Sequence, residues 1–512
     1  MEIELKLLLD PADVAAFRRH PLLRRQAVAK PQVQQLTSIY FDTPDLHFWR
    51  HDAALRVRRV HRDWIQTLKG GGQVAAGLHQ RQEWESHVDG AHPDLIALSD
   101  LVGHGTSWAK ILAAVALTDQ LVPIFTTKFR RTLWQLQLAH GGEVELALDQ
   151  GEVQHNAARI PISEVELELK SGDPAELFEF ALQLQNAVPM RVGNISKAER
   201  GYALVAPQPP AVIKAARLEF SSKLTVEQGF QVIVSNCLTQ VQGNETGVAQ
   251  GSDPESVHQM RVGLRRLRSA LGLFAQVTPC PAALQAELDW LTTALGAARD
   301  WEVLAGSTLA VVASACPDEP ELVQLQQAAL AVAQQNRQQA ARAVGSVRYA
   351  RLLLTLGGWI QGARWRELLA EPERGALAAP LAKFAAQTLV LCHGKLKKRG
   401  KQLRGGAPVT RHRVRIAAKK VRYATEFFES LYPARRVRPF VEALTTLQDA
   451  LGWLNDAAVA GGLLQHLRHS HPGVVHSAGF VRGYLAVCTE RDVRQLGKLW
   501  QQFAPMKLPC RK

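Results

Sequence analysis

Directly after Met1 the chain reads Glu2-Ile3-Glu4-Leu5-Lys6-Leu7, so charged and apolar residues alternate without a break. Alternate residues of a β-strand point to opposite faces, so this stretch predicts a strand with one fully charged and one apolar face. The same alternation returns at residues 164–170. Between these two stretches it recurs at residues 55–58, 64–69, 81–85, 128–138 and 143–149. The pattern predicts a β-rich region whose strands carry charge on one face.

The charged faces allow two interpretations. In the first, they are solvated outer surfaces with cross-strand ion pairs, and the apolar faces pack on helices. In the second, the sheet closes and the charged faces line its lumen. Clustered carboxylates there need a divalent cation such as Mg²⁺, which prefers hard oxygen ligands. Clustered Arg and Lys need an anion such as phosphate. We favour the lumen, because so many strands repeat the pattern, and it implies a metal–polyphosphate ligand.

Charge and composition divide the chain into two parts. The 512 residues carry a formal charge of +14, yet residues 1–206 hold 22 basic and 25 acidic side chains, whereas residues 207–512 hold 39 and 22. The break falls at the proline-rich segment 206–210, after which the pattern is helical. We therefore expect an α+β domain at residues 1–206 and an all-α domain at residues 217–512. The basic second half indicates a polyanion partner: nucleic acid, an anionic membrane or a phosphate polymer.

The cysteines and the apolar stretches indicate the compartment. All six cysteines lie in the second half, without a CxxC motif or a Cys/His cluster at zinc spacing, which fits a reducing environment. The N-terminus has neither the basic region nor the apolar run of a signal peptide. The most apolar stretch, residues 303–316, is shorter than the ~20 residues that a membrane span needs. We expect a cytoplasmic protein without membrane contact.

The helical half contains an internal repeat. Residues 258–268 and 412–422 both read H-x-x-R-x-x-x-[RK]-[RK]-x-R, and a second match relates residues 291–303 to 447–459. The offsets predict two similar helical units, at about residues 217–370 and 375–512. On a helix each motif forms one basic stripe. A solvated basic face is the plain alternative, but the duplication favours a polyanion channel between facing stripes. The predicted polyanion ligands are His258, Arg261, Arg265, Arg266, Arg268, His412, Arg415, Lys419, Lys420 and Arg422.

The N-terminal motifs resemble the CYTH domain, or triphosphate tunnel metalloenzyme, over about residues 1–203. The ExExK sequence at residues 2–6 is that family's signature, and six further motifs follow in its order. They lie at residues 40–43, 55–58, 67–70, 81–85, 164–170 and 196–197. The resemblance implies an eight-stranded antiparallel tunnel that hydrolyses inorganic triphosphate or another triphosphate, although some members cyclise ATP.

The same resemblance implies roles for individual residues. Glu2, Glu4, Glu166 and Glu168 are expected to bind Mg²⁺ or Mn²⁺. Lys6, Arg56, Arg58, Lys69, Arg81, Lys128, Arg130 and Lys197 are expected to hold the triphosphate oxygens, where they would neutralise charge on the transferred phosphoryl group. Glu83, Glu85, Glu145 and Asp149 share these faces, with an ion-pair role as an equal alternative, and Glu164 is expected at the tunnel mouth or in solvent.

The repeated helical motifs resemble the CHAD domain, over roughly residues 217–512. This module is often fused to CYTH domains and is associated with binding inorganic polyphosphate, which the resemblance implies as a partner. Asp300 and Asp456 are expected to orient the Arg and His side chains rather than to bind metal. Lys395, Lys397, Lys398, Arg399, Lys401 and Arg404 are expected to form a basic surface loop, with extra polyanion contact as the alternative.

The two resemblances together predict a function. The arrangement resembles bacterial CYTH–CHAD inorganic triphosphatases, so we expect metal-dependent hydrolysis of triphosphate to pyrophosphate and phosphate, with polyphosphate bound by the helical domain. The alternatives are a class IV-type adenylate cyclase and a non-catalytic polyphosphate-binding scaffold. We expect no specific nucleic-acid binding, because no helix-turn-helix, RNA-recognition or KH motif is visible and basic residues are not interleaved with aromatic ones. The sequence leaves the oligomeric state open.

Overall fold

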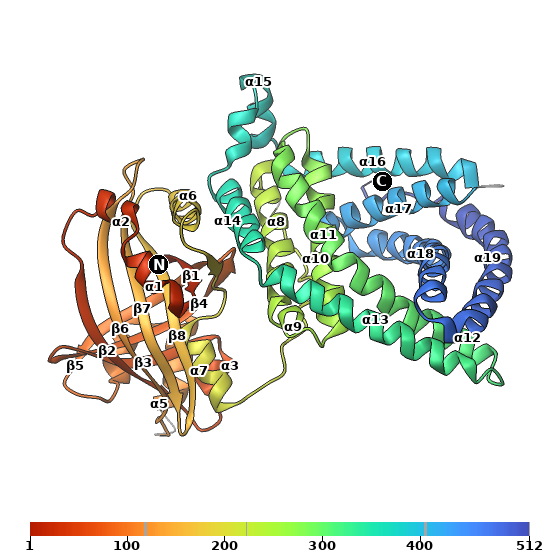
Figure 1. Cartoon of the computed structure of the whole chain (residues 1–512). Helices are drawn as coiled ribbons and strands as arrows, with labels where there is room; N and C mark the ends of the chain where they lie inside the picture. The colour runs from red at the N-terminus through yellow and green to blue at the C-terminus, as the bar shows by residue number, and fades with distance from the viewer. Residues whose placement is uncertain (117–119, 222, 404–406, 511–512) are drawn as a thin grey trace. The chain divides into compact units, whose positions relative to one another are not determined.

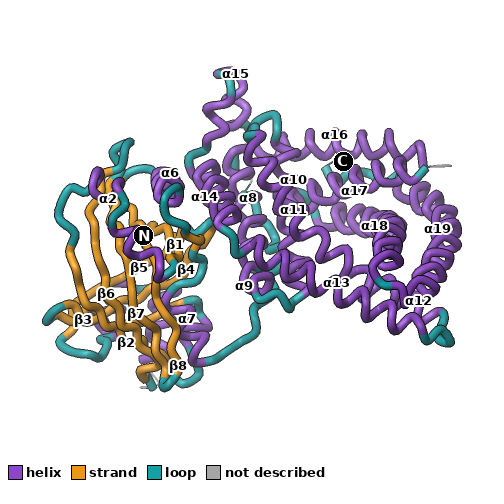
Figure 2. The backbone as a smooth tube through the Cα atoms, viewed as in Figure 1, coloured by secondary structure: helices purple, strands orange, loops and turns teal. Residues whose placement is uncertain are grey.

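A computed structural model describes residues 1–116, 120–221, 223–403 and 407–510. The chain divides into two compact units. Unit 1 consists of Met1–Pro209 and Gly345–Arg364, and unit 2 of Pro210–Val344 and Trp365–Lys512. The strands that the structure describes all belong to unit 1, whereas unit 2 is helical (Figures 1 and 2).

Unit 1 is built on a closed antiparallel sheet. Its strands are β1 (Glu2–Leu9), β2 (Gln32–Asp42), β3 (Ala53–Val60), β4 (Asp63–Ala75), β5 (Leu78–Val88), β6 (Val122–Gln137), β7 (Glu143–His155), β8 (Ala158–Ser171) and β9 (Met190–Val192). They are hydrogen-bonded in the order β5-β4-β3-β2-β6-β7-β8-β1-β9, and β1 also pairs with β5. This last pairing closes the first eight strands into a barrel. The predicted α+β fold with an eight-stranded antiparallel tunnel is confirmed.

The strand register decides which face points into the barrel. Directly opposite residues of antiparallel strands share a face. Glu4 lies opposite Glu168 and Lys6 opposite Glu166, and all four line one cavity. The intervening Leu5 is fully buried on the other face. The charged faces therefore point into the lumen, and the interpretation as solvated outer surfaces is excluded.

Helices cover the apolar outer face of the barrel. Leu55 and Leu68 of β3 and β4 are fully buried beneath the helices that follow β2 and β5. Two helices of unit 1 that are far apart in sequence, α6 and α14, also pack against each other. At their contact Gly357 of α14 approaches Phe178 of α6 so closely that a Cβ on the glycine would lie 2.3 Å from the Phe178 ring. The helices of unit 1 are α1 (Val14–Arg18), α2 (Pro21–Gln26), α3 (His47–Arg50), α4 (Leu95–Val102), α5 (Ser107–Ala116), α6 (Pro174–Gln185), α7 (Lys197–Val205) and α14 (Val347–Gln361).

Helix α7 packs against the inner face of the barrel. It begins with a capping box in which the Ser196 and Glu199 side chains bond each other's backbone N–H groups. Tyr202 is buried in an apolar cluster with Phe125 and other inward-facing residues of β2, β6, β7 and β8. A Cβ on Gly201 would lie 2.1 Å from the Phe125 ring, so only glycine allows this approach. The first turn of α7 is thereby held beside the charged part of the lumen.

Unit 2 reflects the internal repeat. Helix α10 (Pro254–Phe274) and helix α17 (Pro408–Phe428) have the same length, begin with proline at the first turn and carry the two basic motifs. Among the described residues, every helix is too short or too polar to cross a membrane. The other helices of unit 2 are α8 (Val226–Gly243), α9 (Glu245–Ala249), α11 (Ala282–Val303), α12 (Leu309–Ala315), α13 (Glu321–Val344), α15 (Glu371–Arg374), α16 (Leu381–Gly400), α18 (Ala434–Ser470) and α19 (Val475–Phe503).

Candidate functional site

The barrel lumen holds a cavity of about 300 Å³ with a charged lining. Apart from Tyr40, Ser196 and three alanines, every residue that lines it is charged. Eight strands, β1 to β8, and the start of α7 supply these residues, and the strand residues converge on the cavity because inward-facing positions alternate along each strand. The cavity brings together ten of the predicted ligands: Glu2, Glu4, Lys6, Arg56, Arg58, Lys69, Arg81, Glu166, Glu168 and Lys197.

Two predicted phosphate ligands lie elsewhere, and this corrects the sequence prediction. The side chains of Lys128 and Arg130 are exposed, on the outer face of β6. Arg131 takes the inner position, opposite Asp149, to which it donates two hydrogen bonds of 2.8 and 2.6 Å. The prediction assumed that the cationic alternation marks the inner face. On β6 the inner face carries Phe129 and Arg131 in place of Lys128 and Arg130. Phe129 can point inward because α7 provides an apolar partner inside the barrel.

Lys6 joins the two acidic strands of the lumen. Its Nζ lies 2.8 Å from Glu4 Oε1 and 2.6 Å from Glu166 Oε1. Burial acts to raise the pKa of Glu4, but the neighbouring cationic groups, Lys6 first and then Lys69, together outweigh it and lower the pKa to about 2. Glu4 is therefore ionised at neutral pH and available as an oxygen donor.

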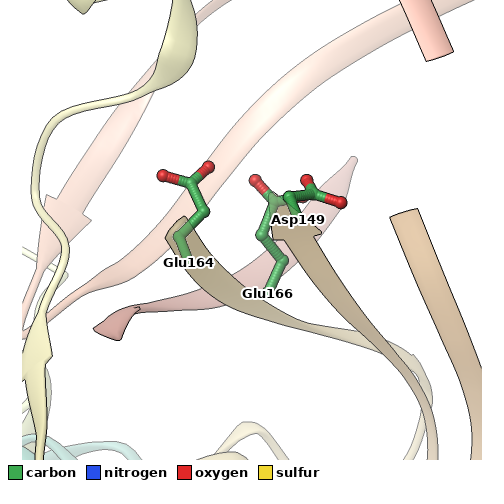
Figure 3. A group of neighbouring side chains, drawn as sticks. All are labelled: Asp149, Glu164 and Glu166. Carbon is green, nitrogen blue, oxygen red and sulfur yellow. The ribbon is translucent and has the colours of Figure 1, made fainter. Parts of the chain in front are cut away.

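Asp149, Glu164 and Glu166 form a buried acidic cluster (Figure 3). Their carboxylate oxygens lie within 4.8 Å of one another. The Lys197 ammonium lies 2.7 Å from Asp149 and 2.9 Å from Glu166, and it also pairs with Glu164. Burial acts to raise the pKa values of Asp149 and Glu166, but Arg131 and Lys197, with Lys6 in the case of Glu166, hold both below their ordinary range. Protein cations thus already balance the cluster.

The carboxylates of Glu2 and Glu168 are less well balanced. Burial raises both pKa values, and it is only partly offset by Lys69 at 2.8 Å from Glu2 and Lys170 at 2.5 Å from Glu168. Glu4, which lies opposite Glu168, adds a third negative charge. A divalent cation with hard oxygen ligands fits this donor set. Of the predicted metal ligands, Glu166 has the most cationic partners and fits least well.

The opposite imbalance exists around Arg58. Its Nε donates to Ser38 Oγ at 3.1 Å, and within the described part of the chain it forms no ion pair. Burial, followed by repulsion from Arg56 and Arg131, lowers its pKa to about 9. Arg56 itself comes no closer than 3.6 Å to Glu83 and Glu85. Arg58 thus lacks an anionic partner among the described residues, and together with Arg56 it fits an anion with several oxygens.

Pattern reasoning missed three side chains of the lumen. Arg131 and Ser38 are inward by register, and Arg200 of α7 pairs with Glu164. The strand pairing identifies Arg131 as an inward-facing residue, because it stands opposite Asp149 and lies two residues from Phe129, on the same face. Arg200 follows Lys197 by one helical turn, so both reach the same acidic cluster.

In unit 2 the structure brings the two repeated motifs together. Arg265 Nε of α10 donates to Tyr423 Oη of α17 at 2.7 Å. Burial, then repulsion from Arg265 and Arg415, lowers the pKa of Lys419 to about 7. Asp300 and Asp456 act electrostatically on these cations and on each other, consistent with an orienting role. The basic cluster, as we call it below, consists of Arg261, Arg265, Arg299, Arg415 and Lys419 with Asp300 and Asp456.

The other predicted polyanion ligands surround the cluster or point away from it. Arg268 and Arg422 pair with Asp289 and Glu426, and His412 lines a hollow with Arg415. Burial and the neighbouring Arg299 lower the pKa of His258 to about 4, so it is neutral at pH 7. Arg266 and Lys420 follow the stripe residues Arg265 and Lys419 by one position, which turns them to other faces of their helices.

The contacts of Arg266 are those of a structural residue. Its side chain is buried, donates to Gln240 and Asn236 at 3.0 and 2.9 Å, and lies over the Phe427 ring. Lys420 lines a different hollow, between α10, α16 and α17. Neither joins the basic cluster, which removes them from the predicted polyanion site.

The predicted basic loop is largely helical. Lys395, Lys397, Lys398 and Arg399 belong to the last turns of α16, and Lys401 begins a short 3₁₀ segment. Arg404 lies outside the described residues. Lys and Arg are good helix formers, and positive charge is favourable at a helix C-terminus, so Gly394 does not break the helix.

Comparisons with known proteins identify the two domains. Residues 1–202 match the CYTH domain family, and residues 232–465 match the CHAD domain family. The chain joins a CYTH domain to a CHAD domain. It is 39% identical to the CHAD domain from the plant Ricinus communis, whose crystal structure it matches with a TM-score of 0.52 over 57% of this chain and 96% of that one. It therefore belongs to the CHAD family.

A curated relative is similar to part of the chain. The inorganic triphosphatase of Haemophilus influenzae is 32% identical over 204 residues, which is 40% of this chain and 54% of the relative. The chain thus spans about half the length of that relative. CYTH tunnel enzymes are metal-dependent, and the lumen of this CYTH domain holds the buried acidic cluster.

Proposed function

We propose that the CYTH domain hydrolyses inorganic triphosphate to pyrophosphate and phosphate with Mg²⁺ or Mn²⁺, and that the CHAD domain binds inorganic polyphosphate. One observation carries the first part: the lumen has too little negative charge around Arg58 and too much around Glu2 and Glu168. A phosphate chain complexed with a divalent cation corrects both imbalances. The similarity to an inorganic triphosphatase supports the same class of reaction.

Inorganic triphosphate is favoured over a nucleotide by the lining of the cavity. Nearly all lining side chains are charged, and Tyr40 is the only aromatic ring that the described residues contribute to it. Nucleoside-binding pockets are usually lined by apolar and aromatic side chains around the base. The cavity volume of about 300 Å³ lies at the lower end of the usual range for sites of small organic ligands.

The roles of the side chains follow from their positions. Arg56, Arg58 and Lys69 would hold the phosphate oxygens and offset the charge that develops on the transferred phosphoryl group. Glu2, Glu4 and Glu168 would hold the metal ion, which when bound neutralises phosphate charge and orients water. The remaining cations of the lumen keep the acidic cluster ionised and fixed. A loose transition state for phosphoryl transfer needs little help from a general base.

Product analysis tests this proposal. The full chain is incubated with Mg²⁺ or Mn²⁺ and, separately, triphosphate, pyrophosphate, ATP and long-chain polyphosphate, and the products are separated by ion exchange. We expect metal-dependent release of equal amounts of pyrophosphate and phosphate from triphosphate, and a loss of about 100-fold or more in Glu4→Gln. Cyclic AMP from ATP would favour the cyclase alternative. No turnover of any substrate would favour a non-catalytic scaffold.

The basic cluster supports polyphosphate binding by the CHAD domain. It places five cations against two carboxylates, and burial lowers the pKa values of Arg261 and Arg415, so a bound polyanion would relieve their mutual repulsion. Polyphosphate binding by the full chain is compared with that of Arg265→Ala and of Arg494→Ala, a matched control that pairs with Glu490 on α19. We expect weaker binding only in Arg265→Ala. Equal or tighter binding of random duplex DNA at physiological salt would contradict the assignment.

A further inference from the structure

A hollow in unit 2 is separate from the basic cluster. It lies between the end of α10, helix α16 and helix α17, and its volume is about 730 Å³. Sites for small organic ligands usually have volumes of about 300–1,000 Å³. We call it the α16 groove, because α16 contributes more of the described lining residues than any other helix does.

The floor of the α16 groove is apolar. Leu273, Phe384 and Ala417 line it from three helices, and Val277 lines it just after the end of α10. Ile416 and Leu391 are 43% and 62% exposed, which is unusual for large aliphatic side chains that share one hollow. An apolar ligand would remove this surface from water at about 25 cal/mol per Å². A phosphate chain has no apolar part that could use it.

The rim of the groove is cationic. Lys383, Lys395, Arg399 and Lys420 all line it, and no Asp or Glu is found among the described lining residues. Lys420 Nζ lies over Gly272, 3.6 Å from the position that a Cβ would take there. None of the three lysines forms an ion pair or hydrogen bond with another described side chain, whereas Arg399 donates only to a backbone carbonyl of α17. Their charge is available to a ligand.

We propose that the α16 groove binds a single-chain amphiphile with an anionic head group, such as a medium-chain carboxylate or alkyl phosphate. The aliphatic chain lies on the floor formed by Leu273, Phe384 and Ile416, and the head group meets Lys395 and Lys420 at the rim. Each methylene buried contributes about 0.8 kcal/mol, and a charged head that meets unpaired cations selects the anion over the alcohol. This site is independent of the proposed triphosphatase and polyphosphate functions.

Calorimetry with defined probes tests the inference on the full chain. Decanoate is titrated below its micelle concentration, with decanol and inorganic phosphate in parallel. We expect decanoate to bind at least about tenfold more tightly than either, because only decanoate offers both a chain and a charge. Equal binding of decanol would show that the head group is not recognised and would overturn the proposal, as would no binding of decanoate.

Variants locate the site. Lys395→Gln with Lys420→Gln should weaken decanoate binding about tenfold, and Ile416→Asp should do the same by placing a carboxylate in the groove. All three positions are exposed, so folding is retained. Lys398→Gln, an exposed lysine of α16 outside the groove, and Arg265→Ala, in the basic cluster, should bind decanoate normally. Equal affinities in all variants would contradict the site.

Cys392 gives a second readout at the same place. Its thiol lines the groove and is half-buried. Bound decanoate should slow alkylation of Cys392, followed by mass spectrometry of its peptide, while the rate at Cys488, on α19, stays the same. Unchanged alkylation of Cys392 at saturating decanoate would place the ligand elsewhere.

Discussion

Tyr202 donates a hydrogen bond of 2.8 Å to Asp42 and thereby ties helix α7 to the end of strand β2. Asp42 is fully buried and also accepts from the backbone N–H groups of Thr43, Phe48 and Trp49, so it caps α3 as well. Because α7 carries Lys197 into the lumen, this one carboxylate fixes a cation at the proposed active site. The Tyr-Phe-Asp-Thr motif at residues 40–43 is explained by this structural role.

Removing the hydroxyl group tests that role. Burial, then Asp42, raises the pKa of Tyr202, so the hydroxyl keeps its proton and remains a donor. Tyr202→Phe should lower the free energy of unfolding by about 1–3 kcal/mol, because it removes a buried hydrogen bond to a charged group. Urea unfolding measures this change. We also expect kcat for triphosphate to fall more than KM rises, since α7 positions Lys197; unchanged kcat and unchanged stability would contradict the account.

The affinity for the metal ion should depend on Glu168. If Glu2, Glu4 and Glu168 hold the ion, Glu168→Gln weakens Mn²⁺ binding by about tenfold or more, because a neutral amide is a poorer hard-oxygen ligand than a carboxylate. Calorimetric titration of the full chain with Mn²⁺, without substrate, measures the affinity. Glu145→Gln, which also lines the cavity but is not among these three carboxylates, is the matched comparison. Normal affinity in Glu168→Gln, with loss in Glu164→Gln, would move the metal to the acidic cluster.

Polyphosphate binding should depend on pH through Lys419. Its pKa is about 7 in the free protein, and a bound polyanion raises it because negative charge favours the ammonium form. Below pH 7 the ammonium is present before and after binding, so affinity is constant there. Above pH 7 binding must take up a proton, and affinity should fall by up to about tenfold per pH unit.

A guanidinium at the same position is the control for this pH dependence. Lys419→Arg carries a group that stays charged, so its affinity should remain flat from about pH 6 to pH 9. Fluorescence titration with labelled polyphosphate at several pH values compares the two proteins. The same decline in Lys419→Arg would exclude Lys419 as its cause.

Much of the fold could be predicted from the alternation of charged and apolar residues along the strands. A sheet that carries charge on one face of so many strands must bury its apolar face, either by closing into a barrel or by packing on helices. The charged residues of β1 and β8 define the lumen without ambiguity, since the residues that alternate with Glu2, Glu4 and Lys6 in β1, and with the charged residues from Glu164 to Lys170 in β8, are all aliphatic. On β6 both faces carry cations and aromatic residues, and the correct parity depends on α7, which contributes Tyr202 from far along the chain. The local sequence of β6 does not reveal its contact with Tyr202.

The helical half shows the same limit. Helices α10 and α17 and the facing of their motifs follow from the repeat. The neighbouring positions Arg266 and Lys420 do not, because one residue on a helix turns a side chain by about 100°, and only the packing of α8 and α16 decides what it meets. Helix α14 also belongs to unit 1 through its contact with α6, a long-range contact that no sequence period reveals.

The central claim is that the inner face of the barrel carries out the chemistry, and β6 allows its most direct test. The measurement is the initial rate of phosphate release from inorganic triphosphate with Mg²⁺ by Arg131→Gln and Arg130→Gln, adjacent arginines that differ in the face they occupy. We predict a loss of about 100-fold or more in Arg131→Gln and a change of less than about twofold in Arg130→Gln. Equal effects, or a larger loss in Arg130→Gln, would contradict the account.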